Sequence, residues 1–309
     1  MKLISIVVPV FNEEGNIDKI FKEISKHIPN KYNYEIIFVN DGSSDKTLDI
    51  VKELSHNNSK AKYISLSRNF GHQYALKAGL DNSYGDAVIS LDGDLQHPPS
   101  LIPELLKEWE NGAEVVGTQR VDNDDSSLFK TLSSKWFYRI FTFLSELDLP
   151  EGAADFRLLD KSVVDTIRTL KESNLFIRGL VQWMGYKQVY VKYSAKKRNT
   201  GVSKYSLMKM IRFSLSGLTS FSIRPLHLSS VFGLCTSFIG FIYGVYAIFS
   251  HIYLGQTVDG WTSIVASILF IGGIQLLSMG IFGEYLGKMF IESKRRPIYI
   301  ISESSDAKK

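Results

Sequence analysis

The chain has 309 residues, 44% of them hydrophobic, and a formal net charge of +4 at pH 7. Its length allows about two domains, and its single cysteine, Cys235, excludes an intramolecular disulfide framework. No basic run is interleaved with aromatic residues, so the mild basic excess does not indicate nucleic acid as a partner.

Strands and helices are expected to alternate in the first part of the chain. Short apolar runs rich in β-branched residues predict strands at 3–10, 34–39, 63–66, 88–91 and 113–118. Apolar residues at helical spacing lie between these runs, and the first helix is expected to open at Asn12. The pattern predicts an α/β fold, a mostly parallel Rossmann-like sheet with helices on both faces. Neither a Gly-x-Gly-x-x-Gly dinucleotide fingerprint nor a P-loop sequence is present.

Polar side chains gather where the predicted strands end. Pro9 and Glu13 belong to the first strand end, Asp41 to the second, and Asp92 and Asp94 to the fourth. The carboxyl ends of parallel strands share one edge of the sheet, so these residues can meet in one crevice. Two carboxylates separated by one glycine repel each other unless a cation lies between them, and oxygen ligands suit Mg²⁺ or Mn²⁺. The alternative is a surface turn, because Asp-Gly is a common turn signal.

Two long apolar stretches follow the predicted sheet. Residues 228–254 and 261–283 contain no Asp, Glu, Lys or Arg, and each is long enough to cross a ~30 Å hydrocarbon core. The link at 255–260 carries no Lys or Arg, whereas both flanks do, so the positive-inside rule places both flanks in the cytosol. Two buried core helices are the alternative. The expected organisation is a cytosolic catalytic domain at 1–225, a two-helix transmembrane domain at 226–291 and a cytosolic tail at 292–309.

Two further segments have expected roles. Residues 203–222 place apolar side chains at roughly helical spacing among lysines and arginines, which is typical of a helix lying in the membrane interface. A plain core-packing helix is the alternative. The polar, Asp-rich segment 122–127 is expected to form a loop that closes over a bound substrate.

Six short motifs resemble a known family. They are Val7–Glu14, Val39–Asp45, Leu91–Pro98, Ala154–Asp160, Arg178–Leu180 and Arg198–Tyr205. The chain resembles the inverting GT-A glycosyltransferases of family 2, above all the polyprenyl-phosphate branch, which includes dolichol-phosphate mannose synthase and bacterial undecaprenyl-phosphate glucosyltransferases. The resemblance extends to about Pro297 and includes the two carboxyl-terminal membrane helices of the bacterial branch.

The resemblance implies a role for each matching residue. The nucleotide sugar would be held by Pro9, Glu13, Asp41 and Asp92. A Mg²⁺ or Mn²⁺ ion and the diphosphate would be bound by Asp92, Asp94 and Gln96. The acceptor phosphate would be met by Arg120, Lys135, Arg198 and Lys204. Lys135 stands where relatives tend to have Arg, and Lys cannot form the bidentate fork of a guanidinium. The reaction itself is assigned to Asp94, Asp155, Arg120 and Arg198. Asp155 would orient the acceptor or one of these cations, or else be a buried carboxylate paired with Arg157.

The function implied is a membrane-bound, inverting hexosyltransferase. It would move a sugar from a nucleotide sugar to polyprenyl phosphate at the cytosolic face of the plasma membrane. UDP-glucose is the first choice of donor, followed by UDP-N-acetylglucosamine, UDP-galactose and GDP-mannose. One alternative is a processive polysaccharide synthase, but its usual Gln-x-x-Arg-Trp segment is missing, and only Gln182-Trp183 after Arg178 approaches it. The other alternative is a non-catalytic nucleotide-binding scaffold. The sequence leaves homo-oligomerisation open.

Overall fold

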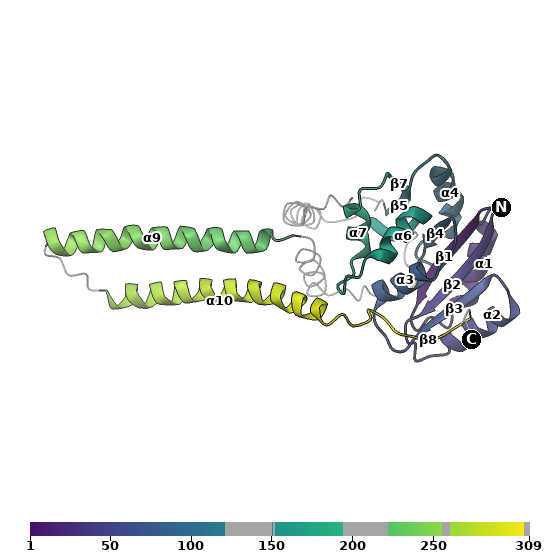
Figure 1. Cartoon of the computed structure of the whole chain (residues 1–309), viewed down its shortest axis with the longest axis horizontal. Coiled ribbons are helices and arrows are strands. Elements are labelled where there is room, and N and C mark those ends of the chain that lie inside the picture. Colours follow the sequence, from purple (N-terminus) through teal and green to yellow (C-terminus); the bar gives the residue numbers. More distant parts are fainter. Residues whose placement is uncertain (121–149, 151, 194–221, 255–259, 306–309) are drawn as a thin grey trace. The chain divides into compact units, whose positions relative to one another are not determined.

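The computed structural model describes residues 1–120, 150, 152–193, 222–254 and 260–305. They divide into two units (Figure 1). The sheet unit contains the described residues up to 193 and those from 296 onward, and the helix unit contains the described residues from 222 to 295.

The described part of the sheet unit is built on one eight-stranded sheet in the order β7-β5-β6-β4-β1-β2-β3-β8 (Figure 1). The strands are β1 (Leu3–Val10), β2 (Asn33–Asn40), β3 (Ala61–Leu66), β4 (Ala87–Ser90), β5 (Val115–Arg120), β6 (Ala153–Asp160), β7 (Gln188–Tyr193) and β8 (Ile301–Ser304). β1 to β4 are mutually parallel, β5 and β7 run in the same direction, and β6 and β8 run against their neighbours. The predicted mostly parallel α/β sheet is confirmed.

Helices cover both faces of this sheet. They are α1 (Ile17–His27), α2 (Thr47–Asn57), α3 (His72–Asp81), the 3₁₀ turn η1 (Pro99–Leu101), α4 (Ile102–Glu110), α6 (Lys161–Thr169) and α7 (Ile177–Trp183). Apolar side chains of α1, α2 and α4 pack with alternate residues of β1 in one buried cluster. The opposite residues of the central strands pack with α3, α6 and α7 in a second cluster. Strands buried on both faces explain the near-continuous apolar runs of the sequence.

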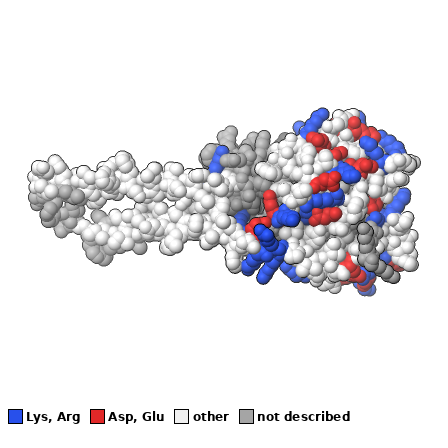
Figure 2. Space-filling model, in the orientation of Figure 1, with Lys and Arg blue, Asp and Glu red and all other residues white. Residues whose placement is uncertain are grey.

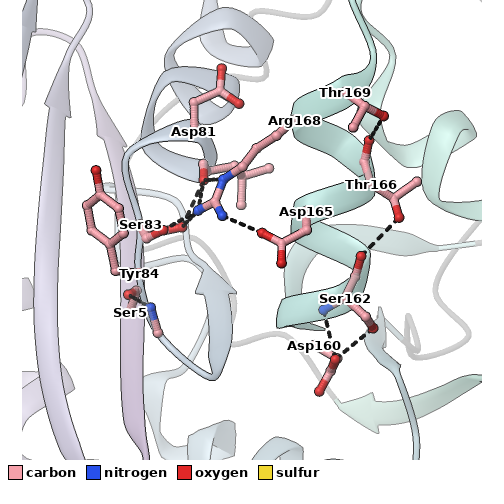
Figure 3. Close-up of polar contacts among 12 residues, drawn as sticks. Ser5, Asp81, Ser83, Tyr84, Asp160, Ser162, Asp165, Thr166, Arg168 and Thr169 are labelled. Atoms are coloured by element: carbon pink, nitrogen blue, oxygen red, sulfur yellow. Dashed lines mark hydrogen bonds and ion pairs between the residues drawn. The ribbon is translucent and has the colours of Figure 1, made fainter.

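Helix α3 is held firmly at its carboxyl end. The Arg168 guanidinium, from α6, donates to the carbonyl oxygens of Leu80 and Ser83 and forms an ion pair with Asp165 at 2.6 Å (Figure 3). A cation at this end also complements the helix dipole. The amino end of α3 therefore has a fixed position in the sheet unit, and that end carries His72 and Gln73.

The segment after the helix unit returns to the sheet. β8 pairs antiparallel with β3, and the N–H of Ser67 donates to the carbonyl oxygen of Ile300 at 2.9 Å. The Tyr299 hydroxyl donates to Asp81, at the end of α3, at 2.8 Å. The sequence predicts residues 292–309 only as a tail, and the structure adds an edge strand to it.

The helix unit consists of two long helices, α9 (Arg224–Leu254) and α10 (Trp261–Ser293). Large apolar side chains are exposed along both helices. Figure 2 shows long white surfaces on this unit and mixed positive and negative charge on the sheet unit. Among the described residues, one stretch, Arg224–Tyr246, is long and apolar enough by itself to cross a membrane, with a mean hydropathy of 1.7. The second predicted span stays a prediction.

One expected boundary was wrong. Helix α1 begins at Ile17 rather than at Asn12, because the residues before it bind the loop that follows β2. The Asn12 side chain accepts a hydrogen bond from the N–H of Ser44 at 2.9 Å, and Asn12 itself has a left-handed φ of 56°. The predicted loop at 122–127 lies outside the described residues, and so does the predicted interface helix apart from its last residue, Ser222.

Candidate functional site

The carboxyl ends of β1 and β4 adjoin a cavity of about 580 Å³, a volume within the range of small-molecule sites. It is lined by Pro9, Phe11, Glu13, His72, Asp92, Gly93, Asp94, Gln96, His97, Gly152, Ala154, Asp155, Arg178 and Tyr193. A smaller cavity of about 220 Å³ lies at the ends of β1 and β2, and it shares Pro9, Phe11 and His72 with the first. The two cavities therefore adjoin each other at the sheet edge that the sequence predicts.

The local sequence explains why this edge is open. β4 pairs with β1 only as far as Ser90 opposite Val7, so Pro9 lies beyond the end of β4. Proline lacks an N–H, and at this position no strand needs one. Gly93 lies against β1, and a Cβ there would stand 2.8 Å from Val10 Cγ1 and 3.2 Å from the Pro9 carbonyl oxygen. Only glycine allows the Asp-Gly-Asp segment to cross the end of β1 this closely.

Asp92 and Asp94 both line the large cavity. Asp92 lies between two imidazoles, with His72 Nε2 at 3.4 Å from one carboxylate oxygen and His97 Nε2 at 3.3 Å from the other. Asp94 accepts hydrogen bonds from the N–H of Gln96, at 3.0 Å, and from the Gln96 side-chain amide. The three residues predicted to hold a metal therefore lie together at the end of β4.

These three side chains supply only part of a coordination shell. Among the described residues, no group of three or more His, Cys, Asp or Glu side chains is arranged to hold a metal by itself. Two carboxylates and one amide oxygen fit a hard divalent cation whose remaining ligands are phosphate oxygens and water. The donor set thus matches a metal shared with a phosphorylated substrate rather than one enclosed by protein.

Asp41 forms the floor of the smaller cavity. Its two carboxylate oxygens accept hydrogen bonds from the N–H groups of Phe70, at 2.8 Å, and Gly71, at 2.9 Å. Burial raises the pKa of Asp41 above its usual range, and the two N–H donors offset part of that effect. The carboxylate joins the end of β2 to the loop after β3, and each oxygen keeps a second lone pair for a ligand.

Glu13 lines the large cavity, and its position depends on the same loop packing. Its N–H donates to Thr47 Oγ1 at 2.8 Å, and its carboxylate accepts from the Asn16 side chain at 2.5 Å. Pro9, Glu13 and Asp41, which the sequence assigns to the nucleotide, therefore surround the two adjoining cavities.

Asp155 is the most heavily paired carboxylate of the site. Arg157 Nη2 lies 2.9 Å from one of its oxygens, and Arg178 approaches both oxygens, through Nε at 3.3 Å and Nη2 at 3.2 Å. The Gln73 amide donates to it at 3.4 Å. Burial disfavours the ionised form, but the charges of Arg178 and Arg157 outweigh burial and hold the pKa of Asp155 well below its usual range. A carboxylate this acidic is a poor proton acceptor.

The predicted acceptor-phosphate residues are only partly placed. Arg120 ends β5, and its backbone pairs in register with Tyr193, which lines the large cavity. Its side chain is not described. Lys135, Arg198 and Lys204 lie outside the described residues. Their role in phosphate binding stays a prediction.

Sequence reasoning missed several side chains that the fold brings to the cavity. His72 opens α3, and His97 accepts or donates a hydrogen bond at 2.7 Å with Tyr193 on β7. Arg178 is noticed in the sequence only as part of a short motif. His72 follows the third predicted strand only after residues 67–71, at the start of the next helix, and a titratable residue at that helix start was the available signal. Nothing local in the sequence connects Tyr193 or Arg178 to this edge of the sheet.

Comparison with known proteins decides the family. Residues 5–168, more than half of the chain, match the model described as Glycosyl transferase family 2. The chain belongs to glycosyltransferase family 2. Membership confirms the family, and the enzyme class, that the motifs at the strand ends indicate.

Relatives within the family match over nearly the whole chain. The Bacillus subtilis glycosyltransferase YkcC is 42% identical over 301 residues, which cover 97% of this chain and 93% of that protein. The bactoprenol glucosyl transferase of Shigella phage SfV is 42% identical over 299 residues, covering 96% of this chain and 97% of that protein. Among solved structures, the chain is similar to the glucosyl-3-phosphoglycerate synthase from Mycobacterium tuberculosis, with 20% identity, a TM-score of 0.46 and coverage of 71% of this chain and 79% of that chain. At that score the likeness does not by itself establish a shared ligand.

Proposed function

We propose that this family 2 enzyme is a membrane-bound, inverting glycosyltransferase that moves a sugar from a nucleotide sugar to polyprenyl phosphate at the cytosolic face of the membrane. The observation that carries the proposal is the match to the bactoprenol glucosyl transferase of phage SfV, which covers 96% of this chain and therefore includes both units. UDP-glucose is the proposed donor, with UDP-N-acetylglucosamine, UDP-galactose and GDP-mannose as alternatives.

The two adjoining cavities suit the two parts of such a donor. The smaller cavity contains the buried Asp41 carboxylate, which can accept from an N–H of the base, and Pro9 lines both cavities. The larger cavity contains Asp92 and Asp94, and in this arrangement it receives the diphosphate and the sugar. Glu13, on the wall of the larger cavity, is proposed to bind a ribose hydroxyl.

The diphosphate leaving group gains negative charge as the glycosidic bond breaks. Asp94, Asp92 and Gln96 are the proposed ligands of a Mg²⁺ or Mn²⁺ ion, which supplies Lewis-acid stabilisation of that charge when bound. The Asp92 carboxylate also joins the loop after β4 to the start of α3, because His72 Nε2 lies 3.4 Å from one of its oxygens.

The proposed nucleophile needs little help from a base. A phosphate monoester is largely anionic near neutral pH, since its second pKa is about 6. Asp155, with its depressed pKa, is therefore assigned to positioning rather than to proton transfer. Attack from the side opposite the leaving group inverts the anomeric centre, so an α-linked donor gives a β-linked lipid product.

The remaining barrier is the repulsion between two phosphate groups brought face to face. Arg120, Lys135, Arg198 and Lys204 are the proposed cations for the acceptor phosphate. Arginine and lysine stabilise phosphate through charge-assisted hydrogen bonds.

The helix unit is proposed to anchor the enzyme in the bilayer. Both α9 and α10 exceed the length that a bilayer requires and expose large apolar side chains. With two spans and with Lys and Arg on both outer flanks, the positive-inside rule favours a topology that has both chain ends and the sheet unit in the cytosol. The helix predicted at 203–222 is proposed to lie in the interface, where the lipid phosphate is found.

The test is transfer by the full-length protein in detergent. It is incubated with polyprenyl phosphate, a divalent cation and each of the four nucleotide sugars in turn, and the lipid product is identified by mass. The expected result is addition of one hexose from UDP-glucose, abolished by excess chelator. No sugar-modified lipid from any donor would contradict the proposal.

A pair of variants tests the metal assignment. Asp94→Ala is expected to abolish transfer, whereas Asp18→Ala, at an exposed acid on α1, is expected to leave it unchanged. Near-normal turnover by Asp94→Ala would show that the metal lies elsewhere.

A further inference from the structure

Arg178 differs from the other cations of the site because its side chain is placed by the structure. It lies in the first turn of α7, and the N–H of its neighbour Ile177 donates to the Gln73 amide oxygen at 3.1 Å. Gln73 belongs to α3, whose far end is held by Arg168 (Figure 3). The start of α7 is thus tied to a helix that is itself fixed against the sheet.

The carboxylate of Asp155 sets the direction of the Arg178 side chain. Contacts from Nε and Nη2 to the two carboxylate oxygens, at 3.3 Å and 3.2 Å, form a side-on bidentate pair. This geometry uses one edge of the planar guanidinium and leaves the Nη1 edge pointing away from Asp155. Among the described residues, Asp155 is the one acceptor that the Arg178 guanidinium contacts, and the Arg178 side chain is 29% exposed.

The charges around Asp155 do not balance. One carboxylate faces two guanidinium groups, and Arg157 is almost completely enclosed, with 5% of its surface exposed. Arg157 donates to Asp155 and to the Ala154 carbonyl oxygen, so it is committed to the interior of the protein. The excess positive charge therefore belongs to Arg178, at the cavity wall.

The lining of the cavity indicates what this charge is for. Among the described lining residues, Arg178 is the one Lys or Arg, and the others that ionise are Glu13, Asp92, Asp94, Asp155 and two histidines. A structural ion pair would need one cation for Asp155, and Arg157 already supplies it. A second, partly exposed guanidinium edge in a cavity is suited to an anionic ligand with several acceptor oxygens, which describes phosphate.

We propose that Arg178 binds a phosphate oxygen of the reacting groups, and that Asp155 is the positioning residue that aims it. The inference rests on the proposed function, which brings two kinds of phosphate to this cavity: the donor diphosphate and the acceptor monophosphate. Both offer the same chemistry to a guanidinium. Arg178 would add to the predicted cations a phosphate contact whose direction is already fixed before substrate binds.

The experiment compares Arg178→Gln, Arg178→Lys and Asp155→Asn with the parent full-length protein. The dissociation constant for UDP with Mn²⁺ is measured by calorimetry, and KM for polyprenyl phosphate and kcat are measured at saturating donor. Arg178→Gln should lose about 10- to 100-fold in one of these quantities, the range expected when a hydrogen bond to a charged group is removed. A loss in UDP affinity assigns the contact to the donor, and a rise in KM for the lipid assigns it to the acceptor.

Conservative variants separate binding from structure. Arg178→Lys retains the charge without the fork, so it should recover part of the lost affinity. Asp155→Asn should weaken the same quantity as Arg178→Gln, by a smaller factor, and the double variant should be no worse than Arg178→Gln alone. Lys192→Gln removes one exposed positive charge from β7, outside the cavity lining, and should change nothing.

Two results would overturn the proposal. One is an Arg178→Gln variant whose UDP affinity, lipid KM and kcat all stay within about twofold of the parent. The other is a loss that accompanies a fall in melting temperature and is not relieved in Arg178→Lys. A parent protein that forms no lipid-linked sugar would instead contradict the proposed function, and direct binding of UDP and of polyprenyl phosphate to the variants would still decide whether Arg178 contacts phosphate.

Discussion

Replacing Gly42 by alanine should damage the nucleotide end of the site through the backbone. Gly42 follows Asp41 and has a φ of +67°. A Cβ there would lie 2.4 Å from the Arg68 carbonyl carbon and 2.5 Å from the Asn69 nitrogen. Both atoms are backbone, so neither can rotate away as the end of a side chain would. Relief requires the loop after β3 to move, and that loop supplies the two N–H groups that bind Asp41.

A second glycine provides a control that separates two causes of lost stability, the left-handed backbone conformation and the close contact of the added Cβ. Gly185 has nearly the same φ, +72°, but a Cβ there has no atom within 4 Å. Gly185→Ala should therefore cost only the left-handed backbone strain, roughly 1 kcal/mol. Gly42→Ala should cost that strain and a further ~1–3 kcal/mol for overpacking.

Thermal unfolding of the full-length variants in detergent, followed by circular dichroism, measures this difference. For a domain of this size, 1 kcal/mol shifts Tm by about 2–4 °C, so Gly42→Ala should melt several degrees below Gly185→Ala. UDP affinity should fall in Gly42→Ala and stay unchanged in Gly185→Ala. Equal melting temperatures would refute the argument that the close backbone approach requires glycine.

Two further predictions concern stability. Asp160 caps α6 and accepts a hydrogen bond from Trp109 Nε1 at 2.8 Å. Burial opposes the ionisation of Asp160, but the hydrogen bonds from Trp109 and Ser162 outweigh burial and lower its pKa. A carboxyl whose pKa is lower in the folded protein than in the unfolded chain stabilises the fold above its ordinary pKa near 4, and this stabilisation is lost as the pH falls further. The difference in Tm between the parent and Asp160→Asn should therefore narrow below about pH 4. A Tm difference that stays constant from about pH 7 to 3 would contradict this. Tyr299→Phe keeps the packing on α3 but removes the 2.8 Å hydrogen bond to Asp81, so the free energy of unfolding should fall by about 1–2 kcal/mol. The control is Tyr84→Phe, at an exposed tyrosine, which should leave Tm unchanged. Matching Tm values for the two tyrosine variants would show that the Asp81 bond contributes nothing.

The parallel sheet could be predicted because its signal is local. Runs such as Ile6–Val10 and Ile36–Val39 are buried on both faces, so each is apolar throughout, and a polar residue, Asn12 or Asn40, follows soon after its end. The edge of the sheet on which Asp41, Asp92 and Asp94 gather follows from parallel pairing alone.

The other features depend on pairings that no local pattern reveals. β6 runs against β4, and that reversal places Asp155 beside the end of β4, where the Ser90 hydroxyl donates to its carbonyl oxygen at 2.5 Å. β8 is four residues long and pairs with a strand more than 230 positions away in the sequence, as in the bond from Ser302 to Ser65. Short edge strands of this kind have little periodicity, so they become visible only in the folded chain.

The first helix shows a third kind of limit, competition between two uses of one segment. Asn12, Glu13 and Glu14 are reasonable helix openers, yet their backbone and side chains bind residues 43–47 instead. Those contacts join the first two strand ends of the proposed nucleotide site. The local preference for a helix start gives way because the tertiary hydrogen bonds satisfy the same groups.

The Asp-Gly-Asp segment forms the turn that its sequence allows, and its role as a metal site stays a proposal. It forms a turn, since Leu95 has a left-handed φ of 57° and Asp94 accepts from the N–H of Gln96. Both carboxylates also line the cavity, because Gly93 lets the turn cross the end of β1. The proposed chemistry depends on both features of this segment, because the turn directs Asp92 and Asp94 toward a diphosphate. The antiparallel neighbour β6 holds Asp155 and, through it, Arg178. The acidic pair and the fixed guanidinium then line one cavity with opposite charges, which is the arrangement that transfer between two phosphates requires.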